Sequence, residues 1–173
     1  KRVFKWWFAW DFEKIESWLE TMAKDGWILE STSLLGFNFY FRESAPVNMR
    51  YCIDYLHTLK PEYRQLTEDD GWEILNIVAG WYVFFKKYAD RRPDLYTDSG
   101  SLLERNKRLI GLFIATGIPV TVVFPRAVQQ MENDTASIVI TIIYILLIGF
   151  YIFGMTKLLK LNRNLKGKKD SSP

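Results

Sequence analysis

The chain has 173 residues, 49% of them hydrophobic and 25% charged, which fits one modest domain plus a further element. Its single cysteine, Cys52, and single histidine, His57, exclude an internal disulfide and argue against a Cys/His metal cluster or catalytic dyad. The net charge of +3 comes from residues 157–173, which carry six Lys or Arg and one Asp. The rest of the chain has no basic stripe, so nucleic acid is not expected as a partner.

Residues 1–44 are expected to form one β-α-β-β unit. The aromatic run VFKWWFAW is typical of a strand, and the next stretch, FEKIESWLETMAKD, has the apolar spacing of an amphipathic helix. Gly26 falls where a left-handed residue ends a helix, and Trp27 opens a second strand. Gly36 marks a turn before a third, alternating strand, FNFYFRE.

Residues 47–88 repeat this order, with NMRYCIDYL as a strand, a helix from Pro61, and the strands WEILNIV and WYVFFKK. Asp-Gly-Trp occurs at 25–27 and again at 70–72, and such self-similarity indicates one supersecondary unit used twice. We therefore expect an α+β fold: a tandem β-α-β-β repeat whose six strands form one sheet with both helices on one face. The repeat markers are Gly26, Trp27 and Gly36 in the first unit, and Gly71, Trp72 and Gly80 in the second.

Aromatic residues mark the surface of this domain, since all seven tryptophans lie within residues 1–90. In a strand, alternate side chains point to opposite sides, so Trp6 and Trp7 are expected on different sides of the first strand. The sheet face that carries these aromatic side chains could be a sandwich core or dimer interface, a groove for an apolar ligand or a partner's segment, or a contact with the bilayer interface. The candidate partner or ligand surface comprises Trp6, Trp7, Phe8, Trp10, Tyr40 and Trp81.

No catalytic, cofactor-binding or metal-binding residues are expected, because no Gly-x-Gly-x-x-Gly or Walker-type loop occurs. The acidic run TEDDGWE is typical of a solvated helix end. Asp54 is expected to pair with Arg50 on the same strand face. An enzyme would require a strongly pKa-shifted Asp54 or Glu30 in a deep pocket.

Two uncharged stretches follow a tether at residues 89–108 and are separated by a loop at 126–136. Residues 137–156 are long enough to cross a hydrocarbon layer of about 30 Å, and predict a transmembrane helix. Residues 109–125 contain Pro119, so this stretch is a kinked transmembrane helix or a re-entrant segment.

Basic residues flank the two uncharged stretches and predict their direction. The sequence ERNKR precedes the first stretch and residues 157–173 form a basic tail after the second, whereas the connecting loop holds one Arg and two acids. By the positive-inside rule both termini are cytoplasmic and the protein is multi-pass. The tail is either a topology anchor or a polybasic switch on anionic lipid.

Three stretches resemble one known family, the domain of unknown function 2812: FAWDFEKIESWLETMAKDGWIL, MRYCIDYL and DGWEILNIVAGWYVFFKK, covering about residues 3–90. The resemblance implies a bacterial cell-membrane protein with this domain ahead of C-terminal membrane helices. Family members are often encoded near PadR-like transcriptional regulators, which implies a role in membrane or envelope-stress regulation. The resemblance brings no catalytic residues.

We expect a membrane-anchored cytoplasmic interaction or sensor domain that binds a protein partner, a second copy or a small apolar ligand. One alternative is a structural accessory subunit of a membrane transporter complex, in which the transmembrane helices select the partner. The other alternative is an enzyme with an unrecognised site.

Overall fold

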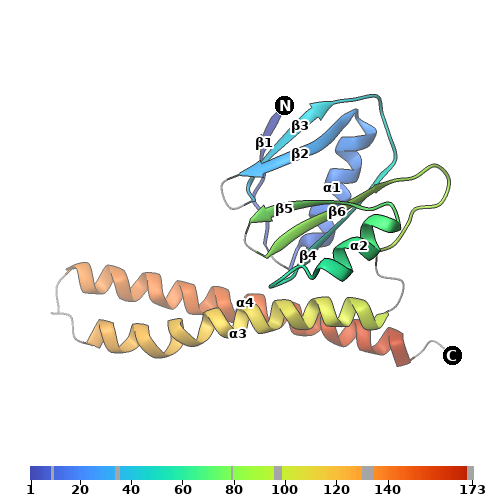
Figure 1. Ribbon diagram of the computed structural model, residues 1–173. Coiled ribbons are helices and arrows are strands. Elements are labelled where there is room, and N and C mark those ends of the chain that lie inside the picture. The colour runs from blue at the N-terminus through green and yellow to red at the C-terminus, as the bar shows by residue number, and fades with distance from the viewer. Residues whose placement is uncertain (9, 34–35, 79, 96–98, 130–134, 171–173) are drawn as a thin grey trace. The chain divides into compact units, whose positions relative to one another are not determined.

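The computed structural model describes residues 1–8, 10–33, 36–78, 80–95, 99–129 and 135–170, and it forms two compact units, Lys1–Thr97 and Asp98–Pro173 (Figure 1). The first unit is an α+β domain, which confirms the expected fold class, and the second is helical. The elements in order are β1 (Arg2–Phe4), α1 (Phe12–Lys24), β2 (Trp27–Ser33), β3 (Asn38–Glu43), β4 (Met49–Tyr55), α2 (Pro61–Asp69), β5 (Glu73–Val78), β6 (Trp81–Lys87), α3 (Ser99–Gln129) and α4 (Thr135–Asp170).

The six strands form two three-stranded antiparallel sheets, ordered β1-β3-β2 and β4-β6-β5, so the expected single sheet is wrong. Strands β2 and β5 are in contact, and the Thr32 hydroxyl donates to the Ile77 carbonyl at 3.3 Å. Both strands have a register shift against the neighbour in their own sheet: between Leu29 and Ser31 where β2 pairs with β3, and between Asn76 and Val78 where β5 pairs with β6. Such bulges bend a strand and disturb its ladder locally.

Strand β1 is shorter than the aromatic run predicts, because it includes only Arg2–Phe4. The Lys5 amide still donates to the Phe37 carbonyl at 2.8 Å, and the chain then leaves the sheet. The indole of Trp7 donates to the Gly36 carbonyl at 2.9 Å and fixes this segment beside the turn between β2 and β3. Most of the aromatic run is therefore a connection that is anchored by side chains.

Helix α1 supplies much of the domain core and packs against both β2 and β4. Its apolar stripe is buried, as the 3.6-residue spacing predicts. Trp18 on this helix meets the rings of Phe39 and Phe41 edge to face, at centroid distances of 5.1 and 5.6 Å. The buried apolar residues of the helix are Phe12, Ile15, Leu19, Met22 and Ala23.

A second core cluster consists of the buried residues Cys52, Trp72 and Phe84. Helix α2 contributes less to this second cluster than α1 contributes to the first core. Thr67 is the one buried residue of α2, and Leu66 on the same helix is 67% exposed. Trp27, which matches Trp72 in the repeated sequence, is only half-buried. The two halves therefore share an order of elements but differ in packing.

The second unit consists of two long helices that pack along each other. Helix α3 begins inside the expected tether and continues through Pro119, and α4 includes most of the basic tail. Asn106 donates to the Leu158 carbonyl at 3.1 Å, and the rings of Phe113 and Tyr151 meet at 5.8 Å. Residues 130–134 of the expected loop lie outside the described part of the chain.

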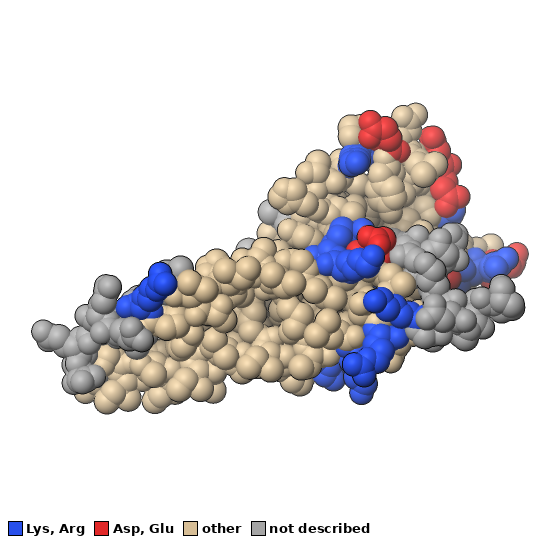
Figure 2. Space-filling model, turned by 90° about the horizontal axis from the view of Figure 1, so that it is seen from below, with Lys and Arg blue, Asp and Glu red and all other residues tan. Residues whose placement is uncertain are grey.

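Within the described residues, one helical stretch, Thr135–Lys166, is long and apolar enough to cross a membrane. Figure 2 shows a long tract of helix surface without charged side chains, bounded by Lys and Arg. Many large apolar side chains of this stretch are at least half exposed, which is unusual for a helix in water. They include Ile138, Ile142, Ile143, Ile145, Leu146, Ile152 and Phe153. These features suggest association with a membrane.

Candidate functional site

An exposed stack of aromatic rings lies at the end of β1. The Trp6 ring stacks on Phe37 with centroids 4.5 Å apart and an interplanar angle of 3°, and Phe4 lies 6.4 Å from Phe37. Trp6 is 59% exposed and Phe4 is 58% exposed. Water therefore covers much of two large apolar side chains, and the stack forms an apolar patch on the surface of the domain.

The stack continues along the segment that leads to α1. Phe8 meets Trp6 edge to face at 5.9 Å, and Phe8 and Trp10 stack at 4.8 Å. Phe8 and Trp10 are half-buried, so the exposed end of the stack is at Trp6. We refer to Phe4, Trp6, Phe8, Trp10 and Phe37 as the aromatic row.

The other residues of the expected surface have different neighbours. Trp7 meets Trp81 edge to face at 5.4 Å, and Trp81 is also 5.4 Å from Tyr55, which joins the connection after β1 to the second sheet. Tyr40 lies on β3, where its hydroxyl accepts a hydrogen bond from Ser33 at 3.1 Å. The structure thus brings Trp6 together with Phe8 and Trp10, and pairs Trp7 with Trp81.

The four glycines of the repeat all have positive φ, at Gly26, Gly36, Gly71 and Gly80. A Cβ atom at Gly26 would lie 2.7 Å from the Ser44 carbonyl oxygen, and one at Gly36 would lie 2.7 Å from the Ile77 side chain. Glycine is the residue that adopts this conformation without strain. These two positions therefore require glycine for both conformation and space.

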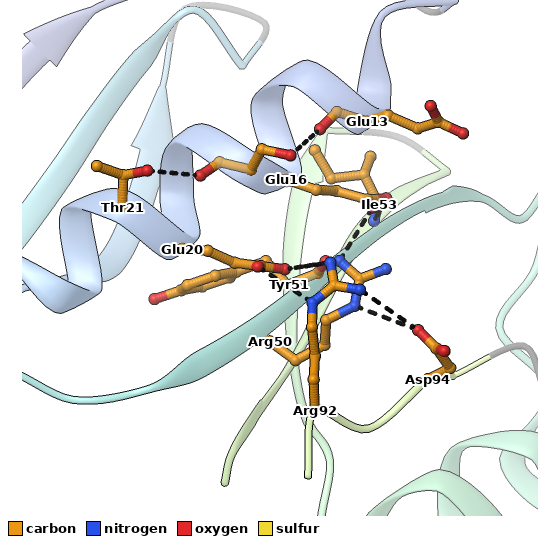
Figure 3. Close-up of polar contacts among 10 residues, drawn as sticks. Glu13, Glu16, Glu20, Thr21, Arg50, Tyr51, Ile53, Arg92 and Asp94 are labelled. Atoms are coloured by element: carbon orange, nitrogen blue, oxygen red, sulfur yellow. Dashed lines mark hydrogen bonds and ion pairs between the residues drawn. The ribbon is translucent and has the colours of Figure 1, made fainter. Parts of the chain in front are cut away.

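A network of ion pairs lies at the edge of β4 and was not expected from the sequence (Figure 3). The Nη1 atom of buried Arg50 is 3.1 Å from Glu16 Oε2 and 2.8 Å from Glu20 Oε1, and it also donates to the Tyr51 carbonyl. Both carboxylates come from α1, so the network joins this helix to the second sheet. We refer to Glu16, Glu20, Arg50, Arg92 and Asp94 as the ion network.

Glu16 binds the main chain of β4 as well as the guanidinium. Its Oε1 atom accepts the Ile53 amide at 2.8 Å, while Oε2 receives Arg50. The side chain is buried, and both oxygens have charged or amide donors, which is what makes burial of a carboxylate tolerable. The contact is a structural clamp between α1 and β4.

The outer part of the ion network comes from the segment after β6. Arg92 binds Glu20 with two nitrogens, Nη2 at 2.9 Å and Nε at 3.3 Å. Asp94 Oδ1 lies 3.7 Å from both Arg50 Nε and Arg92 Nη1. Glu20 therefore serves two arginines, one from β4 and one from the segment that leads to α3.

The pKa shifts in this region fit a structural role. Burial lowers the pKa of Arg50, but Cys52 and the two carboxylates outweigh it, and the pKa is raised overall. Burial also raises the pKa of Tyr51 to about 12, against a smaller opposing effect of the Leu29 amide, which donates to its hydroxyl at 3.5 Å. Neither group exchanges a proton near neutral pH.

One local sequence pattern indicates the ion network, although it was not used as a prediction. Glu16 and Glu20 are spaced i, i+4 and lie next to the apolar stripe of α1, so two acids border the buried face. Their partner Arg50 is 34 residues from Glu16 in sequence, which no local pattern reveals. Among the residues that the structure describes, no group of three or more His, Cys, Asp or Glu could hold a metal ion.

The described residues thus form an α+β domain with a row of exposed aromatic rings and a helical unit that includes one helix long and apolar enough to cross a membrane. The model of one family, described as protein of unknown function (DUF2812), matches residues 11–118, and the chain belongs to this family. The match begins just before α1 and extends into α3, beyond the roughly 90 residues that the sequence resemblance covers. No curated protein and no solved structure matches the chain.

Proposed function

We propose that this protein is a membrane-anchored interaction domain, in which the aromatic row binds a protein partner. The exposed stack of Trp6 on Phe37 carries the proposal. Aromatic side chains dominate the energetics of protein interfaces because they bury large apolar area at a low cost in conformational entropy. Two rings already held face to face lose little freedom on binding.

The proposed anchor is a two-helix transmembrane hairpin made of residues 109–125 and 137–156, with both termini in the cytoplasm of a bacterial cell. The exposed apolar side chains of α4 and the packing of α3 along it support this reading. Arg and Lys within 105–108 and 157–169 support the direction by the positive-inside rule. A role in membrane or envelope-stress regulation would then come from recruiting a partner to the bilayer.

The domain itself is proposed to be a duplicated β-α-β-β unit. Both sheets place the last strand of their unit in the middle, and both carry a register shift in the second strand. Positive φ at Gly26 and Gly71 after the two helices adds a third correspondence. The burial of the two helices differs, so a duplication would have diverged in packing.

Site-specific photo-crosslinking in native membranes tests the interaction. A photoreactive amino acid at position 6 is expected to form an adduct with one protein of defined size, and this adduct should disappear when Phe37→Ala removes the stack. A probe at position 66 is the matched control, because Leu66 is equally exposed but on α2. An adduct of about twice 20.4 kDa would identify a second copy as the partner. Adducts with lipid alone would contradict the proposal.

Topology is tested with introduced cysteines, since Cys52 is buried and reacts poorly in the folded protein. A membrane-impermeant maleimide should label a cysteine at position 133 in intact cells and one at position 168 only after lysis. Equal labelling at both positions would contradict the hairpin.

A groove between α3 and α4 supports a second candidate function, an accessory subunit of a membrane transporter complex. The groove encloses about 360 Å³ and is lined mainly by Phe113, Ile114, Gly117, Tyr151 and Ile152. A groove with a glycine in its wall can accept a helix of another membrane protein. Replacing both proposed transmembrane helices by unrelated apolar helices should abolish association in this case and preserve it in the first.

A further inference from the structure

The stretch Arg92–Leu95, between β6 and α3, is held against the α+β domain by three side chains. Arg92 forms its two-nitrogen contact with Glu20, and Asp94 lies 3.7 Å from Arg50. Leu95 packs against the core cluster around Cys52. We call this stretch the strap. The sequence predicts a tether here, whereas the structure shows that its first part is docked.

The contacts of the strap differ in exposure from the ion pair beneath them. The Arg50–Glu16 pair is buried, whereas the side chains of Arg92 and Asp94 are 46% and 61% exposed. Exposed ion pairs are weak and are screened by salt, whereas buried pairs are screened much less. The strap contacts are therefore the part of the ion network that opens most easily.

The domain side of this contact keeps its charge balance when the strap leaves. Arg50 retains Glu16 and Glu20, and Glu20 retains Arg50, so no buried charge loses all its partners. This matters because an uncompensated buried charge is the main cost of breaking such networks. The site on α1 and β4 is thus formed without the strap and can release and rebind it.

Release of the strap changes the number of free residues that connect the α+β domain to α3. With the strap docked, only residues 96–98 separate Leu95 from Ser99, the first residue of α3, so four steps of about 3.5 Å limit the span to about 14 Å. The Tyr88 amide still donates to the Asn48 carbonyl at 3.1 Å, so release of the strap makes residues 89–98 available and raises the limit to about 40 Å.

We propose that the strap is a reversible latch: docking of Arg92 and Asp94 on Glu20 and Arg50 shortens the free connection between the α+β domain and α3, and release lengthens it. A partner that offers its own basic or acidic groups to Glu20 or Arg50, or a rise in ionic strength, opens the latch. This inference does not depend on the aromatic row, because it concerns only contacts inside the chain.

Hydrogen–deuterium exchange on the full chain in detergent micelles measures the latch. The amides of residues 89–95 other than Pro93 are expected to exchange about 3- to 10-fold faster when Arg92→Ala and Asp94→Ala are combined, as two exposed ion pairs would give. Arg91→Ala is the matched control, because this neighbouring side chain is also basic and exposed. The control should exchange like the wild type.

The salt dependence of exchange distinguishes the contribution of the ion pairs from that of the apolar contact of Leu95, and it can be measured on the wild type. Raising NaCl from about 0.05 M to about 1 M should speed exchange in the wild type and have little effect in the double variant, because charges are screened within about 3 Å at 1 M. Leu95→Ala should speed exchange at both salt concentrations. Salt-independent exchange in the wild type would overturn the ionic latch.

Distance measurements test the change in the length of the connection between the α+β domain and α3. Spin labels at introduced cysteines 62, on α2, and 107, on α3, should report a longer and broader distance distribution in the double variant than in the wild type or Arg91→Ala. Unchanged tryptophan fluorescence would show that the domain is folded, since all tryptophans lie in it. Identical exchange and identical distances in a folded double variant would overturn the proposal.

Discussion

Trp7 and Trp81 meet edge to face, with centroids 5.4 Å apart and an interplanar angle of 90°. One comes from the connection after β1 and the other opens β6, so this ring pair joins the two halves of the domain. Trp6, the adjacent residue in sequence, instead stacks on Phe37 and faces water. Neighbouring tryptophans thus have separate roles, one in folding and one at the surface.

Substitution of the two neighbours should separate these roles. Trp7→Ala removes an inter-sheet ring contact and a hydrogen bond to Gly36, and we expect a loss of about 3 kcal/mol in the free energy of unfolding. Trp6→Ala removes one exposed stacking partner and should cost about 1 kcal/mol. Urea unfolding followed by near-ultraviolet circular dichroism gives both values, and equal losses would contradict the assignment.

Glu16→Ala should destabilise the domain strongly. The variant leaves the Ile53 amide without its acceptor and removes one of the two α1 carboxylates that compensate buried Arg50, so we expect a cost of about 3 kcal/mol. Glu13→Ala is the control, one turn earlier on the same helix and exposed, and should change stability by less than about 0.5 kcal/mol. Similar values for both variants would show that the clamp contributes nothing.

Tyr51 should make the domain sensitive to alkali. Its pKa is about 12 in the folded protein and 10.0 in a model compound, so the unfolded chain loses this proton first. Stability from this group is intact below pH 10 and is lost progressively up to pH 12, by about 3 kcal/mol in all. Tyr51→Phe should therefore weaken the pH dependence of unfolding across this range. The same slope in both proteins would contradict the burial of the hydroxyl.

Two equivalent glycines should tolerate alanine differently. At Gly71 an added Cβ meets only the end of the Lys86 side chain, at 3.7 Å, so Gly71→Ala should cost about 1–2 kcal/mol from its positive φ. At Gly26 the same atom would be 2.7 Å from the Ser44 carbonyl oxygen, and the cost should be clearly larger. Thermal unfolding of both variants makes the comparison, and a reversed order would contradict it.

Local patterns predicted the order of elements because they are set by short-range chemistry. The two helix-ending glycines and the alternation in β3 were readable from sequence, and the separation of Trp6 from Trp7 followed from alternation although β1 ends at Phe4. The division into two sheets was not readable, because the pairing of strands is a long-range property that the alternation within one strand does not determine. The ion network joins residues that are up to 72 positions apart, beyond the range of any local pattern.

The carboxylate of Glu16 on the Ile53 amide has a consequence for how other chains can approach. Strand β4 lies at one side of its sheet and pairs only with β6 there, so its outer amides would otherwise invite strand addition from a neighbouring polypeptide. The Glu16 side chain of α1 already accepts the Ile53 amide on this open edge of β4. Another strand therefore cannot add along β4 at Ile53 unless the Glu16 side chain on α1 moves away first.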